Sequence, residues 1–408
     1  MAVNQFLSRR WSAQQIVSAI IVAGSTLMLL MTLHPELILR NNTPTGGDMG
    51  AHVYGPAYLR DFLLPHFRLT GWSNDWYSGF PMYRFYMVVP ALAVLLVDLM
   101  LPYGIALKMI AVLGILTLPI CTWLFGKFAR FAFPIPELLT LASVVFLYDE
   151  SFTIYGGNIA STMAGEFSFS ISLSLAILGF GLLIRAFDEH RGKMLTALVI
   201  ALSALSHGIV LLFVFGGVVL MALVWFERRS AITAATITVT AVLLSAFWVM
   251  PFLTSHAYMT DMKYEPRPSG ASDSFWSMYF PLTTFWDIVI MFGAVFALVG
   301  FIKSRNRIGI WMGAYCIVLA FGVYFGRESL PVIGLLWNPR LLPFFYLLRY
   351  FLMVIGLYQA AVGLVGIYRV QRLVNKISLQ NSGQEINKGA PASQSANFNL
   401  SWITIFTL

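Results

Sequence analysis

The stretch Gly208–Arg229, GIVLLFVFGGVVLMALVWFERR, decides the fold class. Its apolar run, residues 209–226, falls within the range of about 17–25 residues that an α-helix needs to cross a bilayer. Arg228 and Arg229 follow the run after a single residue, Glu227, and clusters of Lys and Arg concentrate in cytoplasmic loops. The stretch therefore predicts a transmembrane helix that ends on the cytoplasmic side.

The composition of the whole chain agrees with this prediction. Of its 408 residues, 58% are hydrophobic and only 11% are charged, against about 25% charged in soluble domains. The mean hydropathy is +0.76. The net charge of +8 comes mostly from short basic clusters between apolar runs, so orientation in the membrane explains it without a nucleic-acid partner. We expect an all-α, polytopic transmembrane bundle in contact with membrane lipid.

Basic clusters between the apolar runs predict the topology. The predicted spans are 14–36, 105–126, 137–149, 167–187, 194–207, 209–226, 231–253, 284–302, 308–326 and 341–368. The clusters expected in the cytoplasm are Arg9/Arg10, Lys127/Arg130, Arg185/Arg191/Lys193, Arg228/Arg229, Lys303/Arg305/Arg307 and Arg369/Arg372/Lys376. This pattern predicts about 10–11 membrane helices in a bacterial inner membrane, with the N-terminus in the cytoplasm.

One apolar run, FYMVVPALAVLLVDLML (Phe85–Leu101), does not fit the alternation. If it crossed the membrane, every later basic cluster would lie on the wrong side. Pro90 and Asp98 also interrupt it. We interpret 85–102 as a re-entrant or interfacial helix on the outer side. The alternative is that it crosses, and that 137–149 or 194–207 does not.

The remaining segments divide into outer loops and a tail. The membrane module is expected to cover 1–368, with outer loops at 40–104, 149–165, 254–281 and 327–340. Residues 369–399 are interpreted as a polar cytoplasmic linker, and 400–408 as the start of a further span that is cut short. The cytoplasmic loops are short, so chemistry or binding is expected on the outer side.

The first outer loop contains the glycine-rich turn TPTGGDMGAHVYG (43–55). Asp48 follows two glycines, which allow a tight turn and a close approach of backbone to a ligand. His52 lies one helical turn later, on the same face. The pair could hold a divalent metal, Mg²⁺ or Mn²⁺, or act as a general base. Alternatively, Asp48 only caps a helix that runs to about Leu64.

Other candidate residues lie in the outer segments that follow. Arg84 belongs to the aromatic stretch GWSNDWYSGFPMYRFY (71–86), which suits either an interfacial belt or stacking against sugar rings. Asp149 and Glu150 end one span. Glu166 precedes the next, where it could face a cavity or only favour the helix N-terminus. His207 lies at an outer turn, where it could be structural or functional.

Cationic candidates follow the later spans. Arg340 opens the last long helix, and Arg349 lies roughly 13 Å further along it. Guanidinium groups suit phosphate, so both arginines could bind a lipid phosphate, with Lys263 or Arg327 assisting. The alternative is that these arginine side chains extend back to the headgroups.

The order of these features resembles a known family. A first span is followed by an early Asp in a long loop, then by "W…GFP" (Trp76–Pro81), "YGGN…AGEF" (Tyr155–Phe167), "SHG" (Ser206–Gly208) and an Arg at a late helix start. The pattern, over roughly residues 14–350, resembles bacterial membrane proteins of the 6-pyruvoyl-tetrahydropterin synthase-related type. More broadly, it is similar to the GT-C class of membrane glycosyltransferases. No pterin chemistry is expected.

The GT-C resemblance implies an enzyme that transfers a sugar from a polyprenyl-phosphate donor on the outer side of the membrane. It implies that Asp48 is the general base or a metal ligand, and that Asp149, Glu150 or Glu166 supplies a second acid. The sequence departs from the class in having a single clear Asp in the first loop. The soluble C-terminal domain that is often present in the class is either absent or cut off. A transporter or flippase of a polar or lipid-linked solute, and a non-catalytic envelope-biogenesis protein, are the alternatives.

Overall fold

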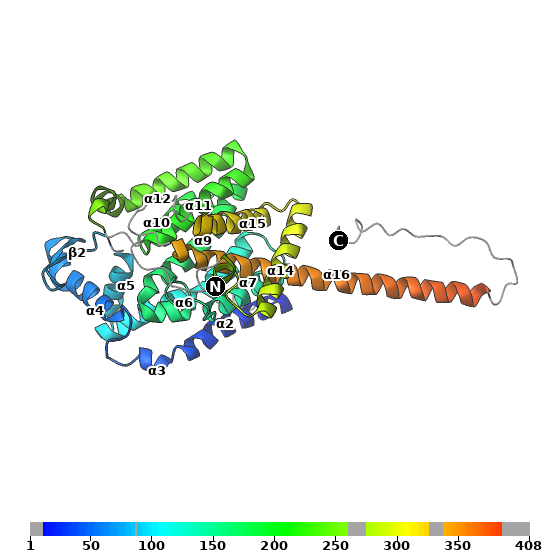
Figure 1. Cartoon of the computed structure of the whole chain (residues 1–408), viewed down its shortest axis with the longest axis horizontal. Helices are drawn as coiled ribbons and strands as arrows, with labels where there is room; N and C mark the ends of the chain where they lie inside the picture. Colours follow the sequence, from blue (N-terminus) through cyan, green and yellow to red (C-terminus); the bar gives the residue numbers. More distant parts are fainter. Residues whose placement is uncertain (1–10, 86–87, 260–274, 326–337, 386–408) are drawn as a thin grey trace, which may run out of the picture.

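The computed structural model describes residues 11–85, 88–259, 275–325 and 338–385. Within these residues the chain is a helical bundle with one small hairpin, which confirms the predicted all-α membrane fold (Figure 1). Eight helical segments are long and apolar enough to cross a membrane. The helices that carry them are α2 (Ala13–Thr32), α6 (Tyr103–Phe128), α9 (Phe167–Glu189), α11 (Gly208–Trp225), α12 (Arg228–Ser255), α14 (Thr284–Lys303), α15 (Arg307–Ala320) and α16 (Leu342–Glu385).

Three shorter apolar helices account for the difference from the predicted 10–11 membrane helices. They are α5 (Val89–Asp98), α7 (Ile135–Leu147) and α10 (Lys193–Ala204). At 1.5 Å per residue, none exceeds about 20 Å, so none alone crosses a hydrocarbon core of about 30 Å. The predicted spans 137–149 and 194–207 therefore correspond to short helices packed within the bundle. The segment interpreted as re-entrant also forms a short helix, α5.

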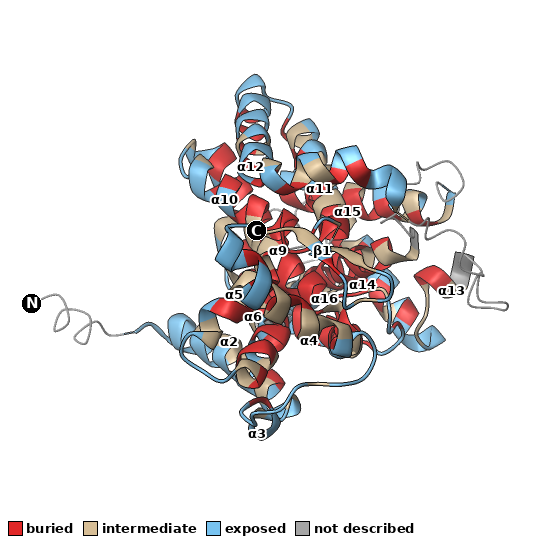
Figure 2. Cartoon of the chain, turned by 90° about the vertical axis from the view of Figure 1, so that its left-hand side faces the viewer, coloured by how far each residue is buried: buried red, intermediate tan, exposed pale blue. Residues whose placement is uncertain are grey.

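Helix α9 lies at the centre of the bundle, and nearly all of its residues are buried (Figure 2). It packs against α6, α10 and α11. Stacked aromatic rings continue this core: the ring centroids of Phe213 and Phe344 are 4.1 Å apart, and the indole of Trp311 donates a hydrogen bond to the Gly217 carbonyl at 3.0 Å. The outer helices instead expose apolar stripes, such as Phe285, Ile288, Phe292, Val295, Val299 and Ile302 on α14. These stripes suit contact with lipid tails.

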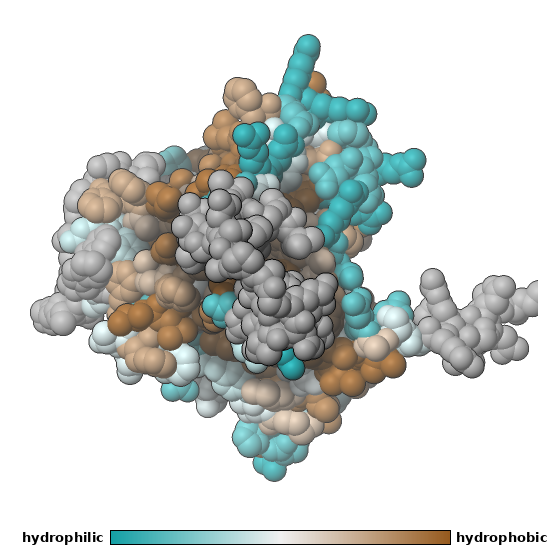
Figure 3. All heavy atoms as spheres, turned by 90° about the vertical axis from the view of Figure 1, so that its right-hand side faces the viewer, coloured by the Kyte–Doolittle hydropathy of each residue, from teal (hydrophilic) through white to brown (hydrophobic). Residues whose placement is uncertain are grey.

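Residues from two of the predicted cytoplasmic clusters, Arg130 and Arg307, form ion pairs at one end of the bundle, while Arg9 and Arg10 lie outside the described residues. The Arg130 guanidinium pairs with Glu189 at 3.4 Å, which joins the ends of α6 and α9. Arg307 pairs with Glu227 at 2.6 Å, which joins the starts of α15 and α12. Figure 3 shows hydrophilic side chains gathered at one edge of this end, beside hydrophobic flanks. Helix α16 extends far beyond the bundle here and continues to Glu385, past the start of the predicted linker (Figure 1).

The opposite end, called the α4 end below, carries the first outer loop (Figure 1). It holds a short helix α3 (Pro35–Ile38), α4 (Met49–Tyr58) with π- and 3₁₀-helical turns that continue it to His66, the hairpin β1 (Gly71–Ser73) and β2 (Phe80–Met82), and α5. The strands pair antiparallel, with Trp72 opposite Pro81. Short elements fill the other described loops: α8 (Ile159–Ser161), a π-helical turn (Thr162–Glu166), α13 (Phe275–Tyr279), and turns at His256–Tyr258, Phe321–Phe325 and Asn338–Leu341.

Candidate functional site

The glycine-rich turn of the first loop makes direct backbone contact with the second loop. The Asp48 amide donates a hydrogen bond to the Ala164 carbonyl at 2.8 Å. Gly47 has φ +51°, and a Cβ there would collide with Ala164. Gly165 has φ +126°, and a Cβ there would lie 2.8 Å from the Cβ of Asp48. Only glycine allows both the positive φ and this close approach, so the glycines bring the two acid-bearing loops together.

The Asp48 carboxylate does not serve as a helix cap. Asp48 occupies the position before α4, but its side chain makes no capping hydrogen bond to the described backbone. The capping alternative required such a bond to an amide in the first turn. The exposed carboxylate is therefore available for another partner, and the helical segment does extend past Tyr58 to His66, close to the predicted Leu64.

A cavity of about 250 Å³ opens beside Asp48 and His52. One stripe of α4 forms its first wall, and the hairpin, the start of α5 and the start of α9 complete it. The lining residues are Asp48, Ala51, His52, Gly55, Pro56, Trp76, Phe80, Met82, Tyr83, Pro90, Ala91, Phe167 and Ser168. Aromatic side chains thus face a carboxylate and an imidazole, in the loop where the sequence predicted a site.

The imidazole of His52 is held against α9. Its ring meets the edge of Phe167, with the ring centroids 5.1 Å apart. Burial lowers the pKa of His52, while the neighbouring Asp48 carboxylate acts in the opposite direction and His207 adds to the lowering. The net shift is downward from an ordinary value of about 6.5. His52 is therefore neutral at pH 7 and can either donate or accept a hydrogen bond.

Glu166 joins the starts of three helices beside this cavity. It directly precedes α9, and its Oε1 pairs with Arg340, which precedes α16. Its Oε2 lies 3.4 Å from Nε2 of His207, which precedes α11. The other ring nitrogen of His207 accepts a hydrogen bond from the Ile209 amide. Burial lowers the pKa of His207 to about 3, so the charged partner of Glu166 at pH 7 is Arg340.

Arg349 belongs to a different environment. It is 3% exposed, donates a hydrogen bond to the Tyr279 carbonyl, and lies 4.7 Å over the ring of Tyr346. Its Nε and Nη2 atoms are buried and have no hydrogen-bond partner in the described part of the chain. Arg349 does not extend to the surface, and it is not one of the described residues that line the cavity. The structure therefore does not bring it together with Asp48.

The other predicted residues are dispersed. Asp149 is buried near Arg349 and accepts a hydrogen bond from the Tyr350 hydroxyl at 2.8 Å. Glu150 is exposed. Arg84 donates a hydrogen bond to the Ser255 hydroxyl at 2.9 Å, which ties the segment after the hairpin to the end of α12. Lys263 and Arg327 lie outside the described residues.

Asp48 and His52 supply only part of a metal site. Searched over the described residues, the chain shows no group of three His, Cys, Asp or Glu side chains that could hold a metal ion. Mg²⁺ is commonly held by one or two carboxylates together with waters and substrate oxygens. The described side chains do not complete a coordination shell, so no reaction step is assigned to a metal.

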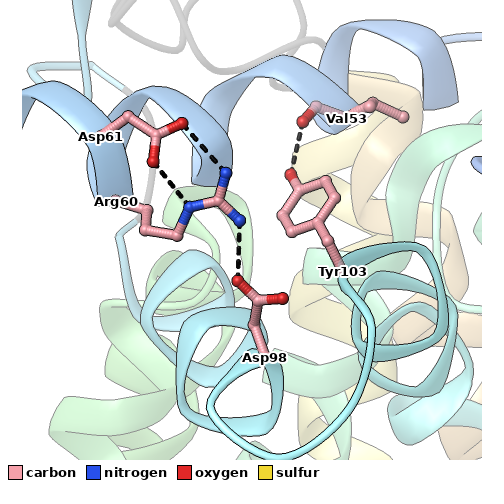
Figure 4. Close-up of polar contacts among 5 residues, drawn as sticks. All are labelled: Val53, Arg60, Asp61, Asp98 and Tyr103. Carbon is pink, nitrogen blue, oxygen red and sulfur yellow. Dashed lines mark hydrogen bonds and ion pairs between the residues drawn. The ribbon is translucent and has the colours of Figure 1, made fainter.

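A polar network anchors the α4 segment (Figure 4). The Arg60 guanidinium donates two hydrogen bonds to Asp61 and one, at 2.8 Å, to Asp98 at the end of α5. The Tyr103 hydroxyl of α6 donates to the Val53 carbonyl at 2.5 Å. The hydrogen bonds to Asp61 and Asp98 raise the pKa of Arg60. Sequence reasoning noted Asp98 only as an interruption, and here it gains a cationic partner.

Sequence reasoning also missed most of the cavity walls. It singled out the aromatic stretch that contains Trp76 and Phe80, but only Arg84 of that stretch was a named candidate. The helical spacing of positions 48, 51, 52, 55 and 56 could have indicated one continuous face of α4. The pairing of that face with the start of α9 needed the fold.

Comparison with known protein families identifies a family that covers most of the chain. Residues 76–371 match the family described as "6-pyruvoyl-tetrahydropterin synthase related domain; membrane protein". No curated protein matches the chain, and no solved structure does either. The matched segment includes the hairpin, Glu166 and Arg340, while Asp48 and His52 precede it. Because the match covers more than half of the chain, this protein belongs to the 6-pyruvoyl-tetrahydropterin synthase-related family of membrane proteins.

Proposed function

We propose that this protein is an integral-membrane glycosyltransferase of the GT-C type, which uses a polyprenyl-phosphate-linked sugar as donor. The observation that carries the proposal is the cavity at the α4 end. There the Asp48 carboxylate, which caps no helix, and the neutral imidazole of His52 face aromatic walls. The start of α9, which forms one of these walls, also carries the Glu166–Arg340 ion pair. Carboxylates and aromatic faces recognise sugar hydroxyls and sugar rings, and an arginine recognises phosphate.

In the proposed reaction, one proton is transferred and a glycosidic bond replaces the bond between the sugar and the phosphate. The Asp48 carboxylate accepts the proton of an acceptor hydroxyl, whose oxygen attacks the anomeric carbon of the donor sugar. The bond between the anomeric carbon and the phosphate oxygen breaks, and polyprenyl phosphate leaves with the electron pair. His52 lies one turn from Asp48 on the same helix face and holds the acceptor through a hydrogen bond.

Arg340 is the group proposed to meet the leaving phosphate. Its planar guanidinium donates parallel hydrogen bonds in a geometry that suits phosphate oxygens. Glu166 acts as a positioning residue, since its ion pair holds Arg340 at the start of α9. Cations placed where negative charge develops commonly contribute much of the rate acceleration. Arg349, buried among aromatic rings, has no step in this scheme.

The test is donor cleavage by purified protein in proteoliposomes, measured as release of polyprenyl phosphate from a panel of polyprenyl-phosphate hexoses. Asp48→Asn is expected to lower kcat by about 10²–10⁴, the usual contribution of a general base. Glu36→Gln is the matched control, because Glu36 is an exposed acid at the same end of the molecule that pairs only with the exposed His34. Full activity of Asp48→Asn in folded protein would refute the assignment.

The alternative role for Asp48 is to hold a divalent ion, Mg²⁺ or Mn²⁺, together with His52, instead of accepting the proton. The same assay after treatment with EDTA, with Mg²⁺ or Mn²⁺ then added back, separates two roles for Asp48. Loss and recovery of cleavage would assign Asp48 to metal binding. Unchanged cleavage would assign it to proton transfer alone.

A further inference from the structure

We propose that the cavity at the α4 end binds the acceptor as a single uncharged ring that bears hydroxyl groups, and excludes rings that carry an anionic group. This inference rests on the proposed function and names its acceptor class. Its basis is the size of the cavity, the arrangement of its aromatic walls and the charge of its lining.

The size of the cavity limits its occupant. Its volume of about 250 Å³ lies just below the ~300–1,000 Å³ that is typical of pockets for drug-sized ligands. A single sugar-sized ring fits this space, whereas a long isoprenoid chain does not. The lipid part of the donor therefore stays outside, against the apolar flank of the bundle.

Aromatic side chains form a wall with available faces. The ring centroids of Trp76 and Phe80 are 5.5 Å apart, and the planes are tilted by 33°. Both residues are half-buried. The Tyr54 hydroxyl hydrogen-bonds Ser73 and Asp75 at 2.6 and 2.9 Å, which holds the hairpin against α4. This wall suits an occupant with one apolar face, as a sugar ring has.

The charge of the lining favours an uncharged occupant. Asp48 is the only acid among the described lining residues, and these residues include neither Lys nor Arg. An anionic ring would therefore meet a carboxylate, with no Lys or Arg in the described part of the lining to offset it. The nearby cation, Arg340, is paired with Glu166 outside the lining.

Ser168 adds a second polar group to the cavity lining. It is 3% exposed, and its hydroxyl has no hydrogen-bond partner among the described residues. Buried polar atoms are nearly always satisfied. A hydroxyl on the bound ring would satisfy this one after rotation about χ1, while the Asp48 carboxylate accepts from another hydroxyl.

The test uses thermal unfolding of the full-length purified protein in detergent, with and without ligand. The ligands are neutral methyl hexosides and the matching methyl hexuronides. A ligand that binds only the folded protein raises the midpoint in proportion to its affinity. We expect the neutral hexosides to raise it, and the hexuronides to bind about tenfold more weakly or worse, because like charges repel in a partly desolvated site.

Three variants make the test specific. Trp76→Ala should abolish the shift by neutral hexosides. Trp72→Ala, on the same hairpin but 60% exposed and outside the cavity lining, should leave it unchanged. Asp48→Asn should remove most of the discrimination against hexuronides. Equal binding of both ligand classes to the unaltered protein, no binding of any neutral hexoside, or an unchanged shift in Trp76→Ala would each overturn the inference.

The outcome is separable from that of the proposed function. If neutral rings bind as expected but no donor is cleaved, the cavity assignment stands and the transferase proposal fails. If donor is cleaved but Trp76→Ala transfers sugar as fast as the unaltered protein does, the transferase proposal stands and the acceptor assignment fails.

Discussion

Replacing Gly165 with alanine should strongly reduce donor cleavage and hexoside binding in a protein that still folds. Gly165 has φ +126°, and an added Cβ would lie 2.8 Å from the Cβ of Asp48. Two carbon atoms normally pack at about 3.5–4.0 Å, so the contact must open by about 1 Å. The backbone strain alone costs about 1–3 kcal/mol, and the clash adds to it. The loop that carries Asp48 must then move relative to α9.

Gly192→Ala provides the matched control. Gly192 also has a positive φ, +75°, but a Cβ there meets nothing within 4 Å. It lies in the turn before α10, on the side of the bundle opposite the cavity. The expected cost is about 1–2 kcal/mol of strain in a left-handed conformation, with no effect on Asp48.

The assay combines thermal unfolding with donor cleavage and hexoside binding. Both variants should unfold at lower temperature. Only Gly165→Ala should also lose cleavage and binding, by at least about tenfold at temperatures where it is fully folded, because a displacement near 1 Å can cost a hundredfold in rate. If both variants keep the same activity, the backbone contact between the two loops does not position Asp48.

Three further predictions concern neighbouring contacts. Burial lowers the pKa of His207 to about 3 in the folded chain, whereas the unfolded chain protonates this residue below about pH 6.5. The neutral His207 therefore contributes fully to stability above pH 6.5, and this contribution declines as the pH falls towards 3. The melting temperature of the His207→Asn variant should fall less between pH 7 and pH 5 than that of the unaltered protein. A double-mutant cycle of Arg60→Gln and Asp98→Asn should give a coupling free energy of unfolding below about 1 kcal/mol, measured by thermal or denaturant unfolding. The reason is that Arg60 is 43% exposed, so solvent screens the ion pair, and a larger coupling energy would contradict this screening. Arg340→Ala should lower kcat for donor cleavage by about 10²–10³, and an unchanged kcat would exclude Arg340 from contact with the leaving phosphate.

The sequence was sufficient for the membrane fold because apolar length and basic clusters act locally. The apolar run 209–226 predicts helix α11 with no information from distant residues. Helices α7 and α10 were harder to interpret, because their apolar composition reflects burial inside the bundle, where full membrane length is not required. The hairpin at Trp72–Pro81 was missed, since its strands have three residues each and no alternation can be recognised over that length.

The site could be predicted only in part. The glycines before Asp48 indicated a close backbone approach, and the structure supplies its partner, Ala164. Glu166, His207 and Arg340 were each identifiable as polar groups at helix starts. Their convergence depends on how α9, α11 and α16 pack, which no local pattern encodes. Arg349 was grouped with Arg340 as a residue that could bind a lipid phosphate, but its depth in the helix does not determine the direction of its side chain around the helix axis.

The hydrogen bond between Asp48 and Ala164 has a consequence for the order of assembly. The α4 segment is synthesised long before the start of α9, and longer still before Arg340. At about 5–20 residues per second, the nascent first loop spends many seconds with one wall of its cavity missing and with the Asp48 amide lacking its Ala164 partner. During biogenesis the loop therefore waits in a partly folded state. The described cavity walls are complete once the start of α9 has joined them, and the Glu166–Arg340 pair forms only when the last long helix has entered the bundle.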